Sequence, residues 1–524
     1  MYGFSVSKYG IVTDNYYKQL GYYKDADPQG SYVMIIRQKN EIKVTQDFCG
    51  SYGIFLFQDK NSNYFALSNS FLLLQQYLSG KSNMTLNKEF ADTLLFSRLC
   101  SPSIYETLIN EITIIPSNAV VIINIISKRL ILEYIDYKEN SIPFESKEGI
   151  DIIDNWIDKW GYIIRSLKKS TDNISFDLSG GYDTRTVLSI LINSGIDLNN
   201  ILIHSAKDKK NPDHEEDFKI ASNISLSLGF ELNKHNLDNR SITWGDENTF
   251  FSTIYSKLGF HKEFYWKTRF FNKPRFVFTG NGGENIRGYP GYPIEKYLQG
   301  ISSQGNQING YEKFFSDSIR SLCNRSVNLL KNRKKYNNDY EISSDLYFKG
   351  RTRYHYGKAA VEGFLSNIYF IQPLIDPDIK KIKFDINEHY PHDLIAFIYS
   401  RYAHELLYFP IQGNRIINIK SIIKAEKINK SIKPYKKKND LNLLFYIDIK
   451  RKSPVTYSYH NNNIDAYFKK FFYSSNFIKI FSKVYNNDIY NWAIIQMKNT
   501  NFFPERHFYG ILAIIITLQN LHLN

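Results

Sequence analysis

The sequence has little of what disulfide-rich, thiolate-metal or fibrous proteins need. Its 524 residues include only 3 cysteines, which are Cys49, Cys100 and Cys323, and they form no Cys-x-x-Cys pair. We therefore expect neither a disulfide framework nor a thiolate zinc site, and a reducing compartment fits better. With 28 glycines and 15 prolines, collagen-like and linker-dominated architectures are excluded.

Long hydrophobic runs are also missing. The longest apolar run near the C-terminal end covers residues 511–518, about half the length that a bilayer-spanning helix needs. We expect it to form a buried helix or strand. The first ten residues, MYGFSVSKYG, lack a basic start followed by an apolar core, so no signal peptide is expected. These features predict a cytoplasmic protein without a membrane span.

What the chain does have is the composition of a globular protein with an excess of positive charge. Hydrophobic residues make up 43% and charged residues 23%, and this length predicts two or three domains. The formal net charge of +14 would suit an anionic partner. The charge is mostly scattered and no recognition motif accompanies it, so we expect no specific nucleic-acid binding.

Two patterns divide the chain. Residues 1–140 contain short apolar runs separated by Asn, Asp and Gly turns, including a hairpin expected over residues 119–134. A polar segment, Tyr137 to Gly149, marks the expected domain boundary. Beyond it, strands and helices alternate at a spacing that predicts a parallel α/β sheet. The expected strands are 174–178, 201–204 and 275–278, and the expected helices are 150–167, 184–194 and 215–228. From about residue 310 the chain is expected to be mostly helical.

The motif that carries chemistry follows the first of these strands. It reads Leu178-Ser179-Gly180-Gly181-Tyr182-Asp183-Thr184, a glycine-bearing turn that enters a helix. Such a turn exposes backbone N–H groups and the positive end of the helix, and both favour a phosphate or pyrophosphate. Asp183 at the helix start can hold Mg²⁺, which prefers carboxylate and phosphate oxygens. The Walker sequence Gly-Lys-Ser/Thr is absent here.

Several further segments match one family in the expected order. The Ser-Gly-Gly-x-Asp-Thr turn resembles the pyrophosphate loop of the asparagine synthetase family and its β-lactam synthetase and lasso-peptide cyclase relatives. The strand ending in Ser205, the acidic pair Glu216–Asp217, the loop from Thr279 to Arg287 and the Pro-Leu-Ile-Asp element ending at Asp376 resemble its other motifs. Asp47 to Ser51, with Ala66 to Ser68, resembles the core of its glutaminase-like domain.

The resemblance implies a fold, a reaction and a set of residues. The fold would be a glutaminase-like αββα sandwich over residues 1–140, then a pyrophosphate-loop ATP-pyrophosphatase domain over 150–524 with a helical, basic extension from about 415. The reaction would be ATP-dependent amide synthesis from a small-molecule or peptide carboxylate, through an acyl-adenylate. Glu284 and Asp183 would hold Mg²⁺ and pyrophosphate. The residues implied to bind ATP are Leu178, Ser179, Gly180, Gly181, Asp183, Thr184, Ser205, Thr279 and Gly280.

The chain departs from the family at positions that matter. The family's metal-binding Asp is Glu284 here, its catalytic Glu is Asn281, which cannot act as a base, and its Glu-x-Arg pair is replaced by Tyr369 and Ile371. Position 2 is Tyr instead of the nucleophilic Cys, and Cys49 is expected to be buried. The amine would therefore be ammonia, a substrate amine, or ammonia supplied by a partner protein. Alternatives are a cyclising synthetase or a catalytically dead member that acts as a binding partner.

A lysine-rich stretch follows the last motif. The family places an essential Lys in this region, so Lys420 or Lys424 is the expected catalytic cation. A solvated helix face is the competing interpretation. If neither lysine acts, Arg351, Arg353 or Lys358 would be the next candidates.

Overall fold

A computed structural model describes residues 1–13, 29–59, 62–96, 103–207, 212–234, 274–287, 293–302, 310–365, 367–383, 392–439, 445–447, 479–498, 514, 516–518 and 521. This part of the chain is mixed α/β, with two parallel sheets among its four sheets. The mixed class and the parallel sheet confirm the sequence-based prediction at that level. None of the helices in the described residues is long and apolar enough to cross a membrane.

Two antiparallel layers form most of the N-terminal part. The larger sheet has the order β16-β2-β1-β3-β4-β8-β9, and the smaller has the order β6-β5-β7. The expected hairpin is confirmed as the pair β8–β9. The bounds are β1 Tyr2–Ser7, β2 Gly10–Val12, β3 Gly30–Gln38, β4 Glu41–Gln46, β5 Phe55–Gln58, β6 Phe65–Ser68, β7 Ile112–Ile114, β8 Ala119–Asn124, β9 Arg129–Tyr134 and β16 Tyr446–Ile447.

Alternation along β5 explains how these layers stack. Leu56 packs with Val44 and Val121 between the two sheets, whereas Phe55 and Phe57 lie in another core with the helices α2 (Phe71–Leu78) and α3 (Lys88–Phe96). Successive side chains of a strand point to opposite faces, so one strand serves both cores. Two β layers and a helical layer result.

The other face of the larger sheet is covered by the second half of the chain. Phe4, from β1, contacts Phe364 of α12 (Lys358–Leu365) and Tyr369 of β14 (Ile368–Ile371), with ring centroids 5.4 and 5.0 Å apart. In an αββα sandwich, this face would be covered by helices of the N-terminal domain. Among the described residues, α12 and β14 from the second half of the chain contact it. The two halves therefore share one hydrophobic core.

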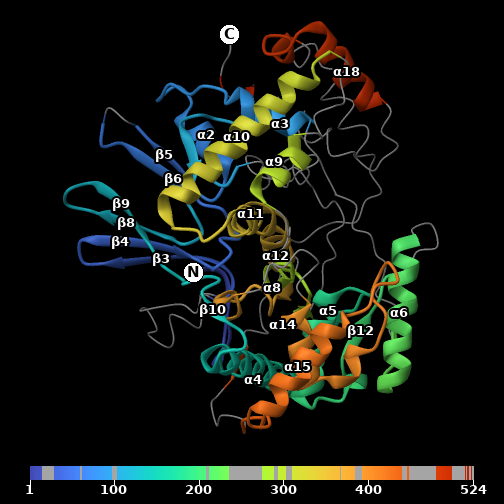
Figure 1. The fold of residues 1–524 in the computed structure, drawn as a ribbon. Helices are drawn as coiled ribbons and strands as arrows, with labels where there is room; N and C mark the ends of the chain where they lie inside the picture. The colour runs from blue at the N-terminus through green and yellow to red at the C-terminus, as the bar shows by residue number, and fades with distance from the viewer. Residues whose placement is uncertain are drawn as a thin grey trace.

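The parallel sheet has the order β12-β11-β13-β14. Its strands are β11 Ile174–Asp177, β12 Leu202–His204, β13 Arg275–Phe278 and β14. Three of them confirm the expected strands. The fourth, β14, was not predicted, because a four-residue apolar run inside a helical region has little periodicity of its own. Figure 1 shows this sheet region beside α5 (Tyr182–Ser194), α6 (Pro212–Leu228), α14 (Asp393–Tyr402) and α15 (Ile419–Ser431).

The expected boundary segment is tied to the second half of the chain. Strand β10 (Ile142–Pro143) pairs in parallel with β15 (Ile382–Lys383), and the N–H of Asn140 donates to the carbonyl of Lys380 at 2.9 Å. Near the other end of the chain, β16 adds a parallel edge strand beside β2. The polar segment is therefore an ordered crossing between the halves, and the domain limits stay a prediction.

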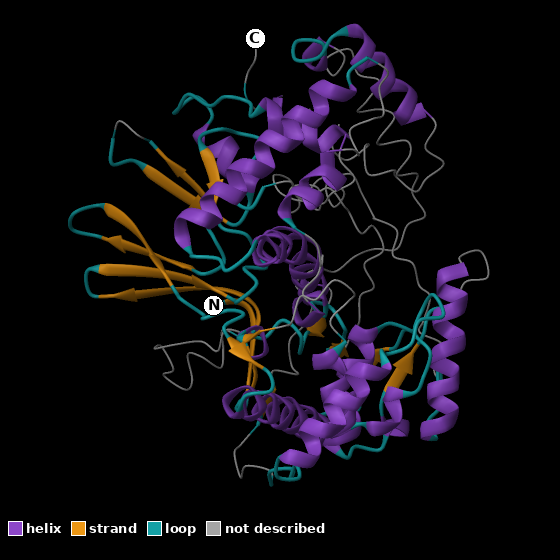
Figure 2. Ribbon diagram, in the orientation of Figure 1, coloured by secondary structure: helices purple, strands orange, loops and turns teal. Residues whose placement is uncertain are grey.

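Helices dominate after residue 310, as expected (Figure 2). The π-helix Phe348–Gly357 continues α11 directly into α12. Within the run 511–518, Ile514, Ile516 and Leu518 are buried against the α2–α3 core, which confirms the expectation of a buried segment. The remaining helices are α4 Lys147–Ser170, α8 Glu284–Arg287, α9 Ile294–Ser302, α10 Glu312–Arg333, α11 Asp339–Tyr347, α13 Pro377–Lys380 and α18 Asn487–Lys498, with 3₁₀ turns at Leu198–Asn200 and His404–Leu407.

Candidate functional site

The Ser-Gly-Gly turn lies at the carboxyl edge of the parallel sheet. Leu178 continues from β11 and donates its N–H to the carbonyl of His204 at 2.8 Å. The chain then turns through residues 179–181 and enters α5, with Gly181 as the N-cap and Asp183 in the first turn. Gly181 has no side-chain oxygen, so the N-cap residue itself does not satisfy the N–H groups at the positive end of α5. This edge is where ligands bind in open α/β sheets.

The N–H groups of the turn are less exposed than the sequence suggested. Ser179 donates to the Thr184 hydroxyl at 3.1 Å, Gly180 donates to Asp217 Oδ1 at 2.8 Å, and Gly181 donates to the Ser179 hydroxyl at 3.2 Å. A buried N–H without a partner is costly, so nearby side-chain oxygens fill this role. The N–H of Gly180 thus donates to a carboxyl oxygen of the chain itself.

The loop after β13 packs directly against this turn. A Cβ added at Gly283 would lie 2.1 Å from Cγ of Asp183, and one added at Gly280 would lie 2.6 Å from the backbone N of Thr184. Only glycine allows such a close approach. Strands β11 and β13 are neighbours, so the two loops meet at one edge. The structure thus brings together the loops that carry Asp183 and Glu284.

The two carboxylates have different surroundings. Glu284 is 5% exposed and accepts a hydrogen bond from the Thr352 hydroxyl at 3.0 Å. Burial raises the pKa of Glu284 to about 7, and the neighbouring charge of Asp183 adds to that rise. Asp183 accepts two hydrogen bonds from Arg287, with Nε–Oδ1 at 2.8 Å and Nη2–Oδ2 at 2.9 Å.

Arg287 is the functional candidate that sequence reasoning missed. It belongs to the quoted loop, but no role was expected for it. Its position on the single-turn helix α8, three residues after Glu284, is the signal that could have found it, because residues three apart lie on one helix face. A guanidinium beside both carboxylates also suits phosphate oxygens.

Two further predicted binding residues flank the turn. Ser205 follows β12, and its backbone forms a reciprocal pair with the Asn233 side chain at 2.9 and 3.0 Å. Its hydroxyl is buried and has no hydrogen-bond partner among the described residues. Thr279 donates its N–H to the carbonyl of Ile371 at 3.1 Å. Both residues therefore lie at the carboxyl ends of strands in the same sheet.

Arg185 and Glu216 hold a neighbouring segment against the site. The buried Arg185 guanidinium donates to the carbonyls of Gly180 and Phe409, both at 3.0 Å, and to the carbonyl of Pro410. Glu216 accepts a hydrogen bond from the N–H of Gly413 at 2.8 Å. Residues 409–413 therefore form a wall beside the turn, which the sequence did not indicate.

The carboxylate pair fits Mg²⁺ by its chemistry. Among the described residues, no group of three or more His, Cys, Asp and Glu side chains forms a metal cluster. Mg²⁺ does not need one, because it commonly binds one or two carboxylates together with phosphate oxygens. Asp183 and Glu284 supply two hard oxygen donors at one place. Both oxygens of Asp183 are held by Arg287, so a metal ion would compete with that arginine.

The predicted catalytic lysines lie on α15, whose N-cap Asn418 contacts His392, the hydrogen-bond partner of the Tyr182 hydroxyl. Lys420 is exposed in the first turn of α15. Lys424 forms ion pairs with Asp393 at 2.7 Å and Glu145 at 2.9 Å. Neither side chain has a described contact with the two loops. The role of these lysines stays a prediction.

The alternative cations lie in the π-helix and directly after it. The buried Arg353 donates to the carbonyls of Gly50 at 3.0 Å and Ile115 at 2.8 Å, which commits it to the N-terminal part. Lys358 is buried at the start of α12, and Arg351 lies in the π-helix itself. Thr352 is the member of this segment that contacts the site, through Glu284.

Cys49 is buried, as the sequence suggested. Burial, with the negative charge of Asp47, raises the pKa of its thiol well above the usual range. A thiolate is the nucleophilic form of cysteine, so this environment disfavours a nucleophilic role for Cys49.

No family model matches this chain. No curated protein matches it significantly either. Its function must therefore be argued from the two loops, their carboxylates and Arg287.

Proposed function

We propose that the protein is an ATP-dependent, AMP-forming carbon–nitrogen ligase. The observation that supports this is the convergence of the Ser-Gly-Gly turn and the loop after β13, with Asp183, Glu284 and Arg287 at one edge of a parallel sheet. A helix N-terminus, an arginine and two carboxylates form a set suited to a metal-bound polyphosphate.

The proposed reaction has two steps. A carboxylate oxygen of the substrate attacks the α-phosphorus of ATP, a P–O bond forms, and the bond to pyrophosphate breaks. An amine nitrogen then attacks the acyl carbon, the bond to AMP breaks, and the amine gives up a proton. Adenylation makes the second step feasible because AMP leaves far more readily than an oxide.

The residues of the chain would divide the work as follows. The N-terminus of α5 and Arg287 bind and orient the phosphates, so that charge developing on pyrophosphate meets fixed positive groups. Asp183 and Glu284 would hold Mg²⁺, which supplies further charge neutralisation when bound. Leu178, Ser179, Gly180, Gly181, Thr184, Ser205, Thr279 and Gly280 would form the rest of the ATP site.

The nitrogen source in this proposal is ammonia or an amine of the substrate. Cys49 and Cys323 are both buried, and burial raises the pKa of each thiol, that of Cys323 to about 12. Neither is suited to releasing ammonia from glutamine, so an external amine or an ammonia-supplying partner is favoured. Cys100 lies outside the described residues.

A catalytically inactive binding protein is the second candidate. It is favoured by Asn281, which cannot serve as a base, and by Arg287, which occupies both oxygens of Asp183. A cyclising ligase would use the same adenylation step and differ only in the origin of the amine.

ATP–pyrophosphate exchange with a panel of carboxylic acids tests the proposal. We expect at least one acid to support exchange, and Asp183→Asn to reduce it by roughly 10²–10³. Asp151→Asn, an exposed change on α4, is the matched control and should retain the wild-type rate. Exchange retained by Asp183→Asn would remove the proposed metal role. ATP binding without exchange for any acid would favour the inactive binding protein.

Single-turnover measurements of amide formation identify the essential cation. Single-turnover rates of Arg287→Ala, Lys420→Ala and Lys424→Ala, each beside its ATP affinity, separate a transition-state contact from simple binding. The cation that acts in the transition state should lose rate far more than affinity.

A further inference from the structure

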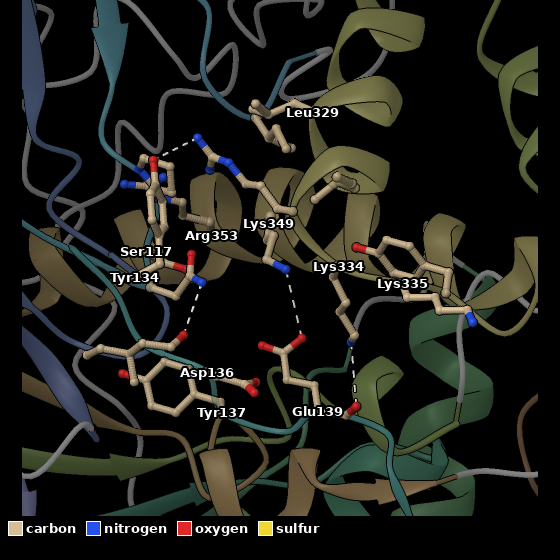
Figure 3. Close-up of a pocket in the computed structure, with 17 residues that line it drawn as sticks. Ser117, Tyr134, Asp136, Tyr137, Glu139, Leu329, Lys334, Lys335, Lys349 and Arg353 are labelled. Carbon is tan, nitrogen blue, oxygen red and sulfur yellow. Dashed lines mark hydrogen bonds and ion pairs between the residues drawn. The ribbon is translucent and has the colours of Figure 1, made fainter. Parts of the chain in front are cut away.

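A cavity of about 570 Å³ lies between the two halves of the chain. Its walls include the end of β9 with the residues that follow it, the C-terminal end of α10 and the π-helix (Figure 3). None of the residues that line it belongs to the Ser-Gly-Gly turn or to the loop after β13. It is therefore separate from the candidate nucleotide site, and its volume is in the range of small-molecule sites.

The lining of this cavity carries more positive than negative side chains. Arg333, Lys334, Lys335, Lys349 and Arg353 face it, against the carboxylates Asp136 and Glu139. Figure 3 shows Lys334 and Lys349 directed toward Glu139. The Lys349 Nζ lies 3.8 Å from a carboxylate oxygen of Glu139, and the Lys334 Nζ lies 3.5 Å from its backbone carbonyl. These contacts leave a positive excess.

Two buried charges behind the cavity wall, Asp345 and Lys380, have opposite signs and leave that excess unchanged. Asp345 is fully buried and lies 3.1 Å from Lys349 and 3.8 Å from Lys334. Lys380 is 2% exposed, and its Nζ has no hydrogen-bond partner among the described residues. An ammonium group buried this way is unfavourable unless opposite charge lies nearby. Asp345 and Glu139 already supply such charge to Lys380, so an anion in the cavity would meet the cations of the lining itself.

The end of a helix does not by itself account for these cations. Lysines and arginines are favoured at a helix C-terminus because they offset its partial negative charge, which can explain Arg333 and Lys334. Lys349 and Lys380 belong to the π-helix and to α13, so the α10 terminus does not explain them. The cations that line the cavity therefore come from two places, the end of α10 with the residues that follow it, and the π-helix.

The remaining walls are aromatic and apolar. Tyr134, Tyr137, Tyr336, Leu329 and Leu330 line the cavity. The Arg333 guanidinium stacks over the Tyr134 ring at 4.5 Å and donates to its hydroxyl at 2.9 Å. These two contacts with Tyr134 fix the position of the Arg333 guanidinium. A ligand here would meet fixed positive groups at one side and rings at the other.

We propose that this cavity is a binding site for a small phosphorylated organic molecule with an aromatic or apolar part. A phosphate ester carries close to two negative charges near neutral pH and accepts several hydrogen bonds, which suits an arginine beside several lysines. The rings and leucines would contact the organic part. The proposal does not depend on the ligase function.

Calorimetric titration with phenyl phosphate tests this site, with phenol, benzoate and inorganic phosphate as comparison ligands. We expect saturable binding of phenyl phosphate that weakens with added salt, weaker binding of benzoate and inorganic phosphate, and none of phenol. Lys335→Glu should weaken binding about tenfold or more, because an exposed side chain at the rim is changed from attractive to repulsive.

Lys331→Glu is the matched control, since Lys331 is exposed on α10 four residues earlier and does not line the cavity. It should bind phenyl phosphate within about twofold of the wild type. Absence of saturable binding, or equal weakening by both variants, would overturn the proposal. Benzoate binding as tightly as phenyl phosphate would also overturn it, as would loss of binding in Asp183→Asn, which would assign the ligand to the nucleotide site.

Discussion

Two carboxylates, one in each half of the chain, are similarly buried but have different partners. Asp47 lies after β4 in the N-terminal part and is 0% exposed, and Glu284 lies after β13 and is 5% exposed. Burial raises the pKa of Asp47 to about 6 and that of Glu284 to about 7. In both, loss of hydration is the largest cause, because a charge is less stable away from water.

Their partners differ. Asp47 accepts hydrogen bonds from the N–H groups of Tyr32, Cys49 and Ser51, each at 3.1 Å, and from the Ser51 hydroxyl at 3.0 Å. These donors fold the loop that carries Cys49. Glu284 accepts from the hydroxyl of Thr352 at 3.0 Å and from its own backbone N–H, and it lies near a second carboxylate, Asp183.

The difference separates a structural acid from a candidate functional one. A carboxylate surrounded by donors organises its own loop, and nothing further is needed there. Two carboxylates close together repel each other, and the arrangement is favourable only with a cation or a proton between them. The π-helix connects the two regions, since Thr352 contacts Glu284 while Arg353 contacts Gly50 beside Asp47.

The largest expected effect is on activity at Glu284. Glu284→Gln keeps the size and the contact with Thr352 but removes the negative charge, so we expect ATP–pyrophosphate exchange to fall by roughly 10²–10³. Asp47→Asn is the matched control, and it should leave exchange per folded molecule near the wild-type rate. If both variants lose exchange equally, the comparison fails, because the loss would then follow from burial alone.

The next effect is on stability at Asp47. Asp47→Ala leaves several buried donors without an acceptor, so we expect the free energy of unfolding to fall by about 2–4 kcal/mol. Urea unfolding measures this. Glu41→Ala, an exposed change at the start of β4, should stay within about 0.5 kcal/mol of the wild type. A similarly small change for Asp47→Ala would show that its donors find other partners.

The elements with strong local patterns could be predicted from the sequence. The strand ending before Ser179 and the helix after Gly181 are marked by an apolar run, a glycine turn and a periodic helix, and both formed where expected. The β8–β9 hairpin is marked in the same way. At the site, the meeting of the turn with the loop after β13 follows from the adjacency of β11 and β13 in a parallel sheet.

Contacts between distant segments could not be predicted. The pairing of β16 with β2 and of β10 with β15 involves two residues on each side, too few for any periodicity. The hydrogen bond from Gly180 to Asp217 crosses 37 positions of the chain. The two bonds from Arg287 to Asp183 depend on how closely Gly283 lets the loops approach, which only the three-dimensional packing determines.

The last expected effect, the smallest when it is taken per pH unit, is the pH dependence of stability, and it isolates Glu284. The folded pKa of Glu284 is raised to about 7 from an ordinary 4.5, so the folded state keeps a proton that the unfolded chain has lost. Between these values the unfolded state binds fewer protons than the folded state. The free energy of unfolding therefore falls as pH rises from about 4.5 to 7, and the stabilising contribution of protonated Glu284 is lost. The raised pKa of Asp47, about 6, produces the same sign but ends at a lower pH.

The difference between wild type and Glu284→Gln removes the contributions that the two proteins share. Glutamine mimics the protonated acid at every pH. The free energy of unfolding of the variant, relative to the wild type, should therefore rise by about 1 kcal/mol for each pH unit up to pH 7, and the difference should stay constant above pH 7. Urea unfolding followed by tryptophan fluorescence measures this, because Trp156 and Trp160 lie in the core that the parallel sheet shares. The informative range is pH 5.5 to 7, and the titration of Asp47, whose pKa is about 6, is shared by both proteins and drops out of the difference. A difference that stays constant from pH 5.5 to 8 would mean that Glu284 is ionised throughout, with Arg287 or a bound cation offsetting the charge of the two carboxylates.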